Sequence, residues 1–289
     1  MKILAGSSNK LLALNLAIAL NAPYIEAAIT YFNDSEIKVE IQESLHNKDV
    51  IIVQSTSKPV NDRLMELFLL IDSAKKAGAA RVILVIPYFG YARQDKTSNQ
   101  AAIPAQIIAG FLEKLEINHI ITIDLHSQEI EKFFNVPVSN LDPISLYIPL
   151  LQTYKNSVIV APDKGSINRV TKISNLLDIE LAYLSKEREA NNCNIVKING
   201  NVSGKNCILI DDIIDSGETL YKAAAFLKQH GALSVQAFIT HAVLSKAYKE
   251  NEDIDNIFIT DTIVVGDLSA KFHIIPILPI IMKELKNIL

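Results

Sequence analysis

Short apolar runs alternate with longer amphipathic segments along most of the chain, and this alternation predicts an α/β fold. The runs are rich in Val, Ile and Leu, which favour buried strands, and they lie at residues 1–5, 49–55, 81–86, 120–123, 158–161, 179–184, 208–210, 234–241 and 256–260. Segments typical of helices lie at residues 10–20, 60–76, 103–115, 143–151, 220–231 and 280–289. Because strands joined through helices pair in parallel, we expect mainly parallel sheets flanked by helices.

The same succession of elements recurs in both halves of the chain, which suggests two similar domains. Predicted strands in both halves run into acidic residues, at Asp124, Asp163, Asp211 and Asp261. The chain has 289 residues, which is enough for two ordinary domains with a core each. We therefore predict an N-terminal α/β domain over residues 1–141 and a C-terminal α/β domain over residues 142–289.

One loop carries the clearest candidate chemistry, and it lies between the apolar run 208–210 and the helix predicted at 220–231. Its polar residues and glycine are Asp211, Asp212, Asp215, Ser216, Gly217, Glu218 and Thr219. Backbone amides at the start of a helix, with hydroxyls beside them, attract an anion such as phosphate. The adjacent carboxylates would repel that anion and suit sugar hydroxyls or Mg²⁺ instead. A simple helix cap would account for Ser216 or Thr219, but it leaves the carboxylate pair unexplained.

Composition and charge narrow the class of protein. Hydrophobic residues make up 49% of the chain and charged residues 21%, as in a globular protein, and the net charge of −4 gives no support to nucleic-acid binding. Cys193 and Cys207 show neither metal-ligand spacing nor a disulfide framework, which fits a reducing cytoplasm. The apolar stretch at 11–20 is interrupted by Asn15, and no run is long enough to span a bilayer. We expect a cytoplasmic enzyme or regulator without nucleic-acid or membrane partners.

Two loops that follow predicted strands carry further candidate residues. The loop at 87–96 holds aromatic residues together with Arg93 and Gln94, and such residues suit a planar base and a polyphosphate. A partly buried aromatic loop without a ligand is an equally open interpretation of that stretch. His126 follows the run 120–123. A lone His is usually structural, but this one lies where open α/β sheets place their ligands.

Two polar stretches by themselves indicate little about function. The turn around Asp34 and Ser35 follows the stretch that starts at Ile29 and precedes residues 37–41, whose strict alternation predicts a strand, and it has the composition of an ordinary turn. The segment 185–192 contains Lys186 and Arg188 among polar residues, and its composition is typical of a solvated, mobile loop. Neither a Walker A loop nor a Gly-x-Gly-x-x-Gly fingerprint is present, so any ATP would be bound by other means.

Taken together, these motifs resemble the ribose-phosphate diphosphokinase family, the phosphoribosyl-diphosphate synthetases. The loop at 211–219 alone resembles the wider phosphoribosyl-diphosphate-binding family, which also contains phosphoribosyltransferases. The matches that narrow the resemblance lie at residues 85–95, 122–126, 133–138, 54–56, 61–62 and 64–67. The resemblance implies two phosphoribosyltransferase-like domains, each a mainly parallel sheet flanked by helices, with a last helix that packs on the N-terminal domain. It also implies transfer of the diphosphoryl group of Mg-ATP to the 1-hydroxyl of ribose 5-phosphate, and a homo-oligomer.

The resemblance implies a role for each matching residue. It places ATP against Phe32, Asp34, Ser35, Glu36, Arg93 and Gln94, with the base at the first four. It places Mg²⁺ at His126 and Asp163, and it assigns catalysis to Lys186 and Arg188. It assigns ribose 5-phosphate to Asp211, Asp212, Asp215, Ser216, Gly217, Glu218 and Thr219.

Several positions depart from the family's common bacterial pattern. Residues 96–102 lack an Arg-rich run, and Lys164 beside Asp163 is similar to the shorter archaeal-type members. Glu218 stands where Gly is frequent, so we expect its carboxylate to point away from a bound phosphate. Two alternatives remain: a phosphoribosyltransferase, which would share only the central loop, and a non-catalytic relative that assembles with a synthetase, against which the retained His126, Lys186 and Arg188 argue.

Overall fold

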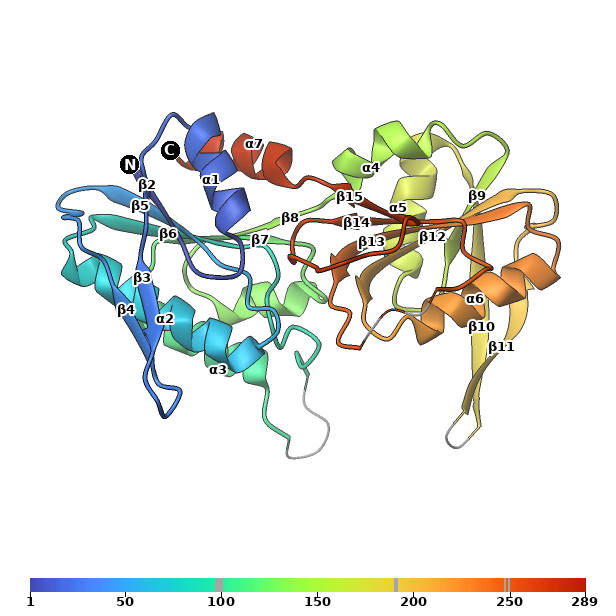
Figure 1. Ribbon diagram of the computed structural model, residues 1–289. Helices are drawn as coiled ribbons and strands as arrows, with labels where there is room; N and C mark the ends of the chain where they lie inside the picture. Colours follow the sequence, from blue (N-terminus) through green and yellow to red (C-terminus); the bar gives the residue numbers. More distant parts are fainter. Residues whose placement is uncertain (97–100, 190–191, 247, 249) are drawn as a thin grey trace. The chain divides into compact units, whose positions relative to one another are not determined.

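The computed structural model describes residues 1–96, 101–189, 192–246, 248 and 250–289, and it describes no side chains for residues 186–196. The chain divides into two compact units (Figure 1). Unit 1 consists of Met1–Asp142, Thr262–Val264 and Ile277–Leu289, and unit 2 consists of Pro143–Asp261 and Val265–Pro276. No helix in the described residues is long and apolar enough to cross a membrane.

Unit 1 is built on a six-stranded sheet in the order β2-β1-β5-β6-β7-β8, in which all neighbours are parallel. The strands are β1 (Lys2–Ala5), β2 (Tyr24–Ile25), β5 (Asp49–Val53), β6 (Arg81–Ile86), β7 (His119–Ile123) and β8 (Val138–Leu141). The central strands β5 and β6 are buried almost throughout. This explains why they are continuous runs of Val, Ile and Leu without polar alternation.

Helices cover both faces of the unit 1 sheet (Figure 1). On one face lie α1 (Lys10–Ala19) and α7 (Leu278–Ile288), and on the other lie α2 (Val60–Lys76) and α3 (Pro104–Lys114), with a short 3₁₀ helix η1 at Gln128–Phe133. The C-terminal helix α7 belongs to unit 1, where it contacts α1 and β8. The Ser139 hydroxyl on β8 donates to the Glu284 carboxylate of α7 at 2.6 Å.

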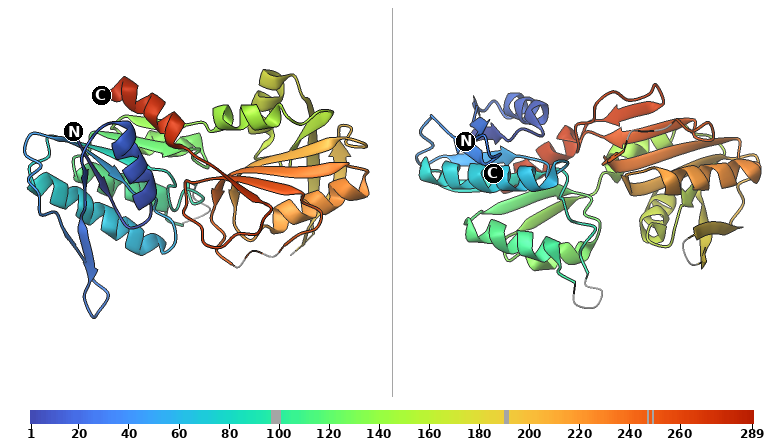
Figure 2. Two further views of the ribbon diagram at one scale, coloured as in Figure 1. Left: turned by 45° about the horizontal axis from the view of Figure 1, so that its top comes forward. Right: turned by 60° about the horizontal axis from the view of Figure 1, so that its bottom comes forward.

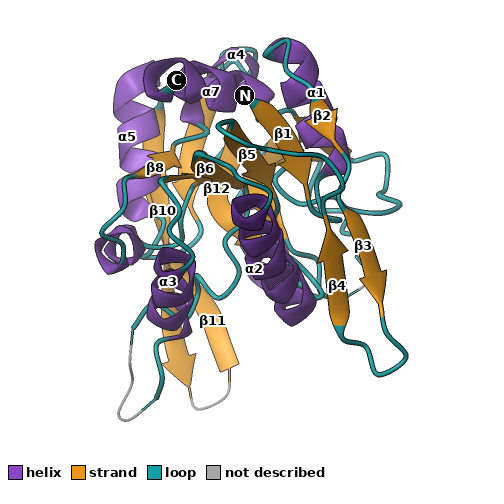
Figure 3. Ribbon diagram, turned by 90° about the vertical axis from the view of Figure 1, so that its left-hand side faces the viewer, coloured by secondary structure: helices purple, strands orange, loops and turns teal. Residues whose placement is uncertain are grey.

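A separate antiparallel hairpin extends from unit 1, formed by β3 (Ala28–Tyr31) and β4 (Ile37–Glu40) (Figure 3). Its base packs on α2, where the Ser73 hydroxyl donates to the Val39 carbonyl at 3.3 Å. Its turn therefore projects from an anchored base.

Unit 2 is built on a seven-stranded sheet in the order β11-β10-β9-β12-β13-β14-β15, in which only the β10–β11 pair is antiparallel. The strands are β9 (Ser157–Ala161), β10 (Glu180–Glu189), β11 (Asn192–Asn199), β12 (Asn206–Ile214), β13 (Ser234–Ala242), β14 (Asn256–Thr260) and β15 (Phe272–Ile275). The predicted fold class, two mainly parallel sheets flanked by helices, is confirmed.

Side chains of the central strand β12 alternate between two cores of unit 2. Leu209 packs into the core shared with α6 (Glu218–Gln229), while Ile208 and Ile210 pack into the core shared with α4 (Ile144–Leu151) and α5 (Ile167–Leu177). The orange α6 lies on one face of the sheet, and the yellow-green α4 and α5 lie on the other (Figure 2). This period of two is that of a strand buried on both faces. It places the chain that follows β12 at the carboxyl end of a central parallel strand.

Two sequence predictions about unit 2 were wrong. Asp211 and Asp212 do not lie in a loop after a strand that ends at Ile210, because β12 continues to Ile214 through pairing with β13. The segment 185–192 is not a simple loop either: the described residues Ser185–Glu189 and Asn192 belong to the β10–β11 hairpin. A two-stranded extension with polar side chains lacks the apolar pattern by which strands are predicted.

Candidate functional site

The loop between β12 and α6 has the backbone geometry of an anion site. Gly217 is the N-cap residue of α6, with φ of 76°, and no side chain caps the helix. The Glu218 amide donates to the Ser216 hydroxyl at 3.4 Å, and the N-cap glycine supplies no side-chain acceptor for the other first-turn amides, which favours an external anion. The side chains of Ser216 and Thr219 are exposed beside this helix start. The structure thus places two hydroxyls and the helix N-terminus together, as predicted from the sequence.

Gly217 is required by both its conformation and its neighbour. Its positive φ is readily adopted by glycine, and a Cβ at this position would overlap the ring of Tyr221. Tyr221 itself lies edge-on against Tyr248, with ring centroids 5.9 Å apart. The hydroxyls of both tyrosines are buried, and this burial raises the pKa of each. This aromatic support of the loop was not predicted from the sequence.

Three carboxylates of unit 2 interact at the carboxyl ends of β9 and β12. Burial, followed by the charges of Asp212 and Asp163, raises the pKa of Asp211 to about 8. The Asp211 carboxylate accepts a hydrogen bond from the Asp212 amide at 3.0 Å. Asp163 accepts from the Ser166 amide at 3.1 Å, which fixes the turn after β9. A raised pKa indicates that this group of acids needs positive charge or hydroxyl donors to remain ionised.

The remaining acids of the loop have separate partners. The Asp215 carboxylate accepts from the Ser245 amide at 3.1 Å, which ties the loop to the segment after β13. The Glu218 carboxylate forms an ion pair with Lys222 one turn along α6, at 2.7 Å, and this pair lowers the pKa of Glu218. The Glu218 side chain is thus directed along the helix, in line with the expectation that it points away from an anion at the helix start.

In unit 1, the four residues predicted to hold the base form the turn of the β3–β4 hairpin. The turn is closed by hydrogen bonds from the Phe32 amide to the Glu36 carbonyl and from the Ser35 amide to the Phe32 carbonyl, both at 2.9 Å. The Phe32 side chain is 56% exposed, and the side chains of Asp34, Ser35 and Glu36 are exposed as well. An exposed aromatic face beside exposed acceptors can bind a planar base.

Arg93 and Gln94 lie on the loop that follows β6, and the side chains of both are exposed. The Gln94 amide donates to the Tyr91 carbonyl at 2.9 Å, so the backbone of this pair is held in a turn.

The predicted metal residues lie in different units, and each is found after a strand. His126 is exposed and follows β7, where Asp124 adopts a φ of 45° and the Leu125 amide donates to the Asn140 side chain at 3.0 Å. Asp163 follows β9 beside Asp211, as described above. No group of three or more His, Cys, Asp or Glu side chains is arranged as a ready metal site among the described residues. Mg²⁺ rarely uses such a cage, since it binds through one or two carboxylates together with water and substrate phosphates.

The predicted catalytic pair is described only as backbone. Lys186 and Arg188 lie on β10, where they pair with Ile195 and Cys193 of β11. Their side chains lie outside the described residues, as does most of the stretch 96–102, whose lack of an Arg-rich run was noted from the sequence.

The sequence matches known domains and proteins over most of its length. Residues 1–115 match the N-terminal domain of ribose phosphate pyrophosphokinase, and residues 145–271 match the phosphoribosyl transferase domain. The protein named ribose-phosphate pyrophosphokinase from Shewanella oneidensis is 42% identical over 272 residues, which cover 91% of this chain and 86% of that protein. The chain belongs to the ribose-phosphate pyrophosphokinase family.

Two further comparisons agree with this membership. The ribose-phosphate pyrophosphokinase from Campylobacter jejuni is 38% identical over 294 residues, covering 99% of this chain and 95% of that protein. The crystal structure of phosphoribosylpyrophosphate synthetase from Mycobacterium smegmatis matches with a TM-score of 0.91 at 28% identity, covering 99% of this chain and 98% of that one. The family resemblance inferred from the motifs is confirmed along nearly the whole chain.

Proposed function

We propose that this member of the ribose-phosphate pyrophosphokinase family transfers the diphosphoryl group of Mg-ATP to the 1-hydroxyl of ribose 5-phosphate. The products are 5-phosphoribosyl 1-diphosphate, a precursor for nucleotide biosynthesis, and AMP. The observation that carries the proposal is the match to ribose-phosphate pyrophosphokinases over both halves of the chain, because a phosphoribosyltransferase would match only the second half. The anion-binding geometry of the β12–α6 loop supports a sugar phosphate as one substrate.

The reaction needs positioning and charge neutralisation more than covalent help. The 1-hydroxyl oxygen bonds to the β-phosphorus of ATP, the bond from that phosphorus to the oxygen of the α-phosphate breaks, AMP leaves, and the hydroxyl proton is released to solvent. Negative charge grows on the oxygens around the transferring group, so cations nearby lower the barrier. We assign this catalytic task to Lys186 and Arg188.

We assign ribose 5-phosphate to unit 2. Its phosphate would accept from the α6 amides at Gly217 to Thr219 and from the hydroxyls of Ser216 and Thr219. Its ribose hydroxyls would donate to Asp211, Asp212 and Asp215, and such donors favour the ionised form of a buried acid. We assign ATP to unit 1, with the base at Phe32, Asp34, Ser35 and Glu36 and the phosphates at Arg93 and Gln94.

The residues fit Mg²⁺ as the cofactor. Asp163 offers hard oxygen ligands, and it lies near Asp211, whose pKa is raised mainly by burial and then by the charges of Asp212 and Asp163. We propose His126 of unit 1 and Asp163 of unit 2 each as a ligand of Mg²⁺, which when bound would neutralise charge on the phosphate oxygens.

Association and location complete the proposal. We propose a homo-oligomer, because the exposed face of α1 carries Leu11 and Ile18, and apolar side chains gathered on a surface favour association. We also propose a cytoplasmic location, which the cysteine usage described above supports. Analytical ultracentrifugation tests the oligomer, and a single monomeric species at micromolar concentration would remove it.

An AMP-release assay tests the activity. The chain is incubated with ATP, Mg²⁺ and ribose 5-phosphate, and AMP, ADP and phosphate are quantified by chromatography. We expect AMP only when all three are present. AMP formed without ribose 5-phosphate would indicate a hydrolase, and its absence under all conditions would favour the non-catalytic relative. A second arm with purified 5-phosphoribosyl 1-diphosphate and a purine or pyrimidine base detects a phosphoribosyltransferase.

A further inference from the structure

The loop that carries Arg93 and Gln94 rests on one buried threonine. Thr56 follows β5, and its side chain is 1% exposed. Its amide donates to the Tyr88 carbonyl at 2.9 Å, and its hydroxyl donates to the same carbonyl at 3.1 Å. The hydroxyl also accepts from the Gly90 amide at 2.6 Å. One hydroxyl therefore acts as donor and acceptor at once, and it fixes both sides of the first bend of the loop.

The loop lies against the backbone of Thr56 with no space between. A Cβ at Gly90 would overlap the Thr56 carbonyl oxygen and would lie 2.9 Å from the side chain of Val60. The position of the bend is thus set by contact as well as by hydrogen bonds. A shift of Thr56 would have to move the whole loop.

A second contact holds the loop one residue further on. Tyr91 has a φ of 65°, which is uncommon for a bulky residue and costs on the order of 1–3 kcal/mol. Its hydroxyl donates to the Asn61 side chain at the start of α2, at 2.7 Å. The Tyr91 carbonyl in turn accepts from the Gln94 amide. The conformation held by Asn61 is therefore the one that orients the backbone of Arg93 and Gln94.

We propose that Thr56 and Asn61 are positioning residues for Mg-ATP, which act by fixing the loop that presents Arg93 and Gln94. Thr56 is buried, so it would act on the nucleotide through the loop. The inference rests on the proposed function in that Mg-ATP is the ligand of this loop. The contacts of Thr56 and Asn61 with the loop then explain the motif matches at residues 54–56 and 61–62. The positioning role was not predicted because both residues are far from Arg93 in the sequence.

Three variants and a matched control test the proposal. Thr56→Val removes the hydroxyl at nearly constant volume, Thr56→Ser keeps it, and Asn61→Ala removes the acceptor of Tyr91. The control is Thr122→Val, because Thr122 is equally buried in the same sheet and its hydroxyl has no hydrogen-bond partner in the described chain. The measurements are the Kd of Mg-ATP by calorimetry, the KM for each substrate, and the Tm.

We expect Thr56→Val to weaken Mg-ATP binding about tenfold, equivalent to about 1.4 kcal/mol, while the KM for ribose 5-phosphate changes less than about twofold. Thr56→Ser should retain most of the affinity, Asn61→Ala should lose about threefold, and Thr122→Val should match the parent. Equal losses for both substrates, or failure of Thr56→Ser to restore binding, would overturn the proposal. If Thr56→Val does not fold, the result for Asn61→Ala, a substitution at an exposed residue, decides. Unchanged Mg-ATP affinity in Asn61→Ala would refute the positioning role.

A separate readout distinguishes failure of this inference from failure of the proposed function. If the parent chain neither binds Mg-ATP nor forms AMP, the proposed function is wrong. Amide hydrogen exchange at Gly90 and Gln94 then still tests the loop: it should be at least tenfold faster in Thr56→Val than in Thr122→Val. Equal exchange rates in the two variants would refute the positioning role.

Discussion

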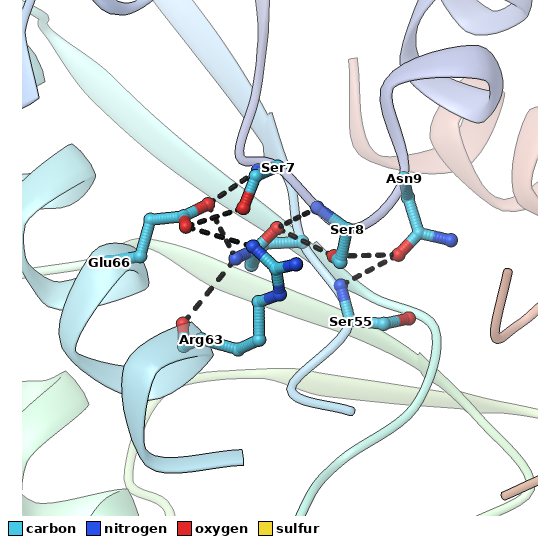
Figure 4. Close-up of polar contacts among 7 residues, drawn as sticks. Ser7, Ser8, Asn9, Ser55, Arg63 and Glu66 are labelled. Atoms are coloured by element: carbon cyan, nitrogen blue, oxygen red, sulfur yellow. Dashed lines mark hydrogen bonds and ion pairs between the residues drawn. The ribbon is translucent and has the colours of Figure 1, made fainter. Parts of the chain in front are cut away.

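The buried carboxylate of Glu66 on α2 allows a sharp test of what holds the start of unit 1 together. Glu66 is 0% exposed and lies at the carboxyl ends of β1 and β5 (Figure 4). It accepts from the Ser7 amide, from the Ser7 hydroxyl at 2.5 Å, from the Gln54 side chain at 2.8 Å and from Arg63 at 3.1 Å. Gln54 in turn accepts from the Ser8 amide at 3.1 Å and from its hydroxyl at 2.6 Å. The loop that leads into α1 is thus fastened through Glu66 and Gln54.

Glu66→Gln keeps the shape of the side chain and replaces one accepting oxygen by a donor. The new amide would face donors of Ser7, Gln54 or Arg63. Loss of one partner of a buried ion pair costs about 3–5 kcal/mol, and each charged hydrogen bond contributes about 1.5–3 kcal/mol. The Arg63 side chain is 20% exposed and can turn towards water. We therefore expect Glu66→Gln to lower the free energy of unfolding by the lower end of the ion-pair range, about 3 kcal/mol. This corresponds to a fall in Tm of about 6–12 °C for a domain of about 150–250 residues.

Thermal and urea unfolding of the ligand-free chain measures this change. The control is Glu252→Gln, an exposed carboxylate of unit 2, which should leave the Tm within about 1 °C because exposed charges contribute little. The loss in Glu66→Gln should persist in 0.5 M salt, since buried pairs are weakly screened. A Glu66→Gln protein as stable as the control variant would show that the carboxylate does not fasten this loop.

Three other predictions follow from the unit 2 site. Lys186→Ala should lower kcat by orders of magnitude with little change in substrate affinity, because its charge acts in the transition state; a raised KM at normal kcat contradicts the catalytic role. Asp215→Ala should weaken ribose 5-phosphate binding and leave ATP binding nearly intact, and equal losses of both affinities in calorimetry would refute that division. The pKa of Asp211 is raised from 3.8 to about 8, so the folded chain keeps a proton that the unfolded chain releases, and stability falls as pH rises through this window. Asp211→Asn should therefore raise the Tm more at pH 8 than at pH 5, and an equal shift at both would show that the pKa of Asp211 is not raised in the folded chain.

Much of the fold follows from local patterns. The predicted bounds of α2, β6 and β14 agree with the structure to the residue, because each is a long periodic helix or a continuous apolar run with polar or glycine boundaries. The extension of β12 through Asp211 and Asp212 could not be predicted locally. It depends on pairing with β13, and two adjacent carboxylates favour a loop over a strand.

The site was predictable to the extent that its residues are adjacent in the sequence. The β12–α6 loop stands out because phosphate and sugar donors and acceptors lie within nine residues, 211–219. Supports from distant segments gave no such signal. Tyr248 against Tyr221, Ser245 against Asp215 and Thr56 beneath the Arg93 loop are brought in by tertiary packing. The resemblance included residues 54–56, but the local sequence does not indicate which segment Thr56 contacts.

The most direct test of the proposed chemistry follows the β-phosphorus of ATP. The chain is incubated with Mg²⁺, ribose 5-phosphate and ATP labelled at the β-phosphorus, and the labelled products are separated. Transfer of the diphosphoryl group predicts that the label appears in 5-phosphoribosyl 1-diphosphate, with an equal amount of unlabelled AMP. Label recovered in ADP, or in inorganic phosphate or diphosphate without a labelled sugar, would contradict the proposed reaction.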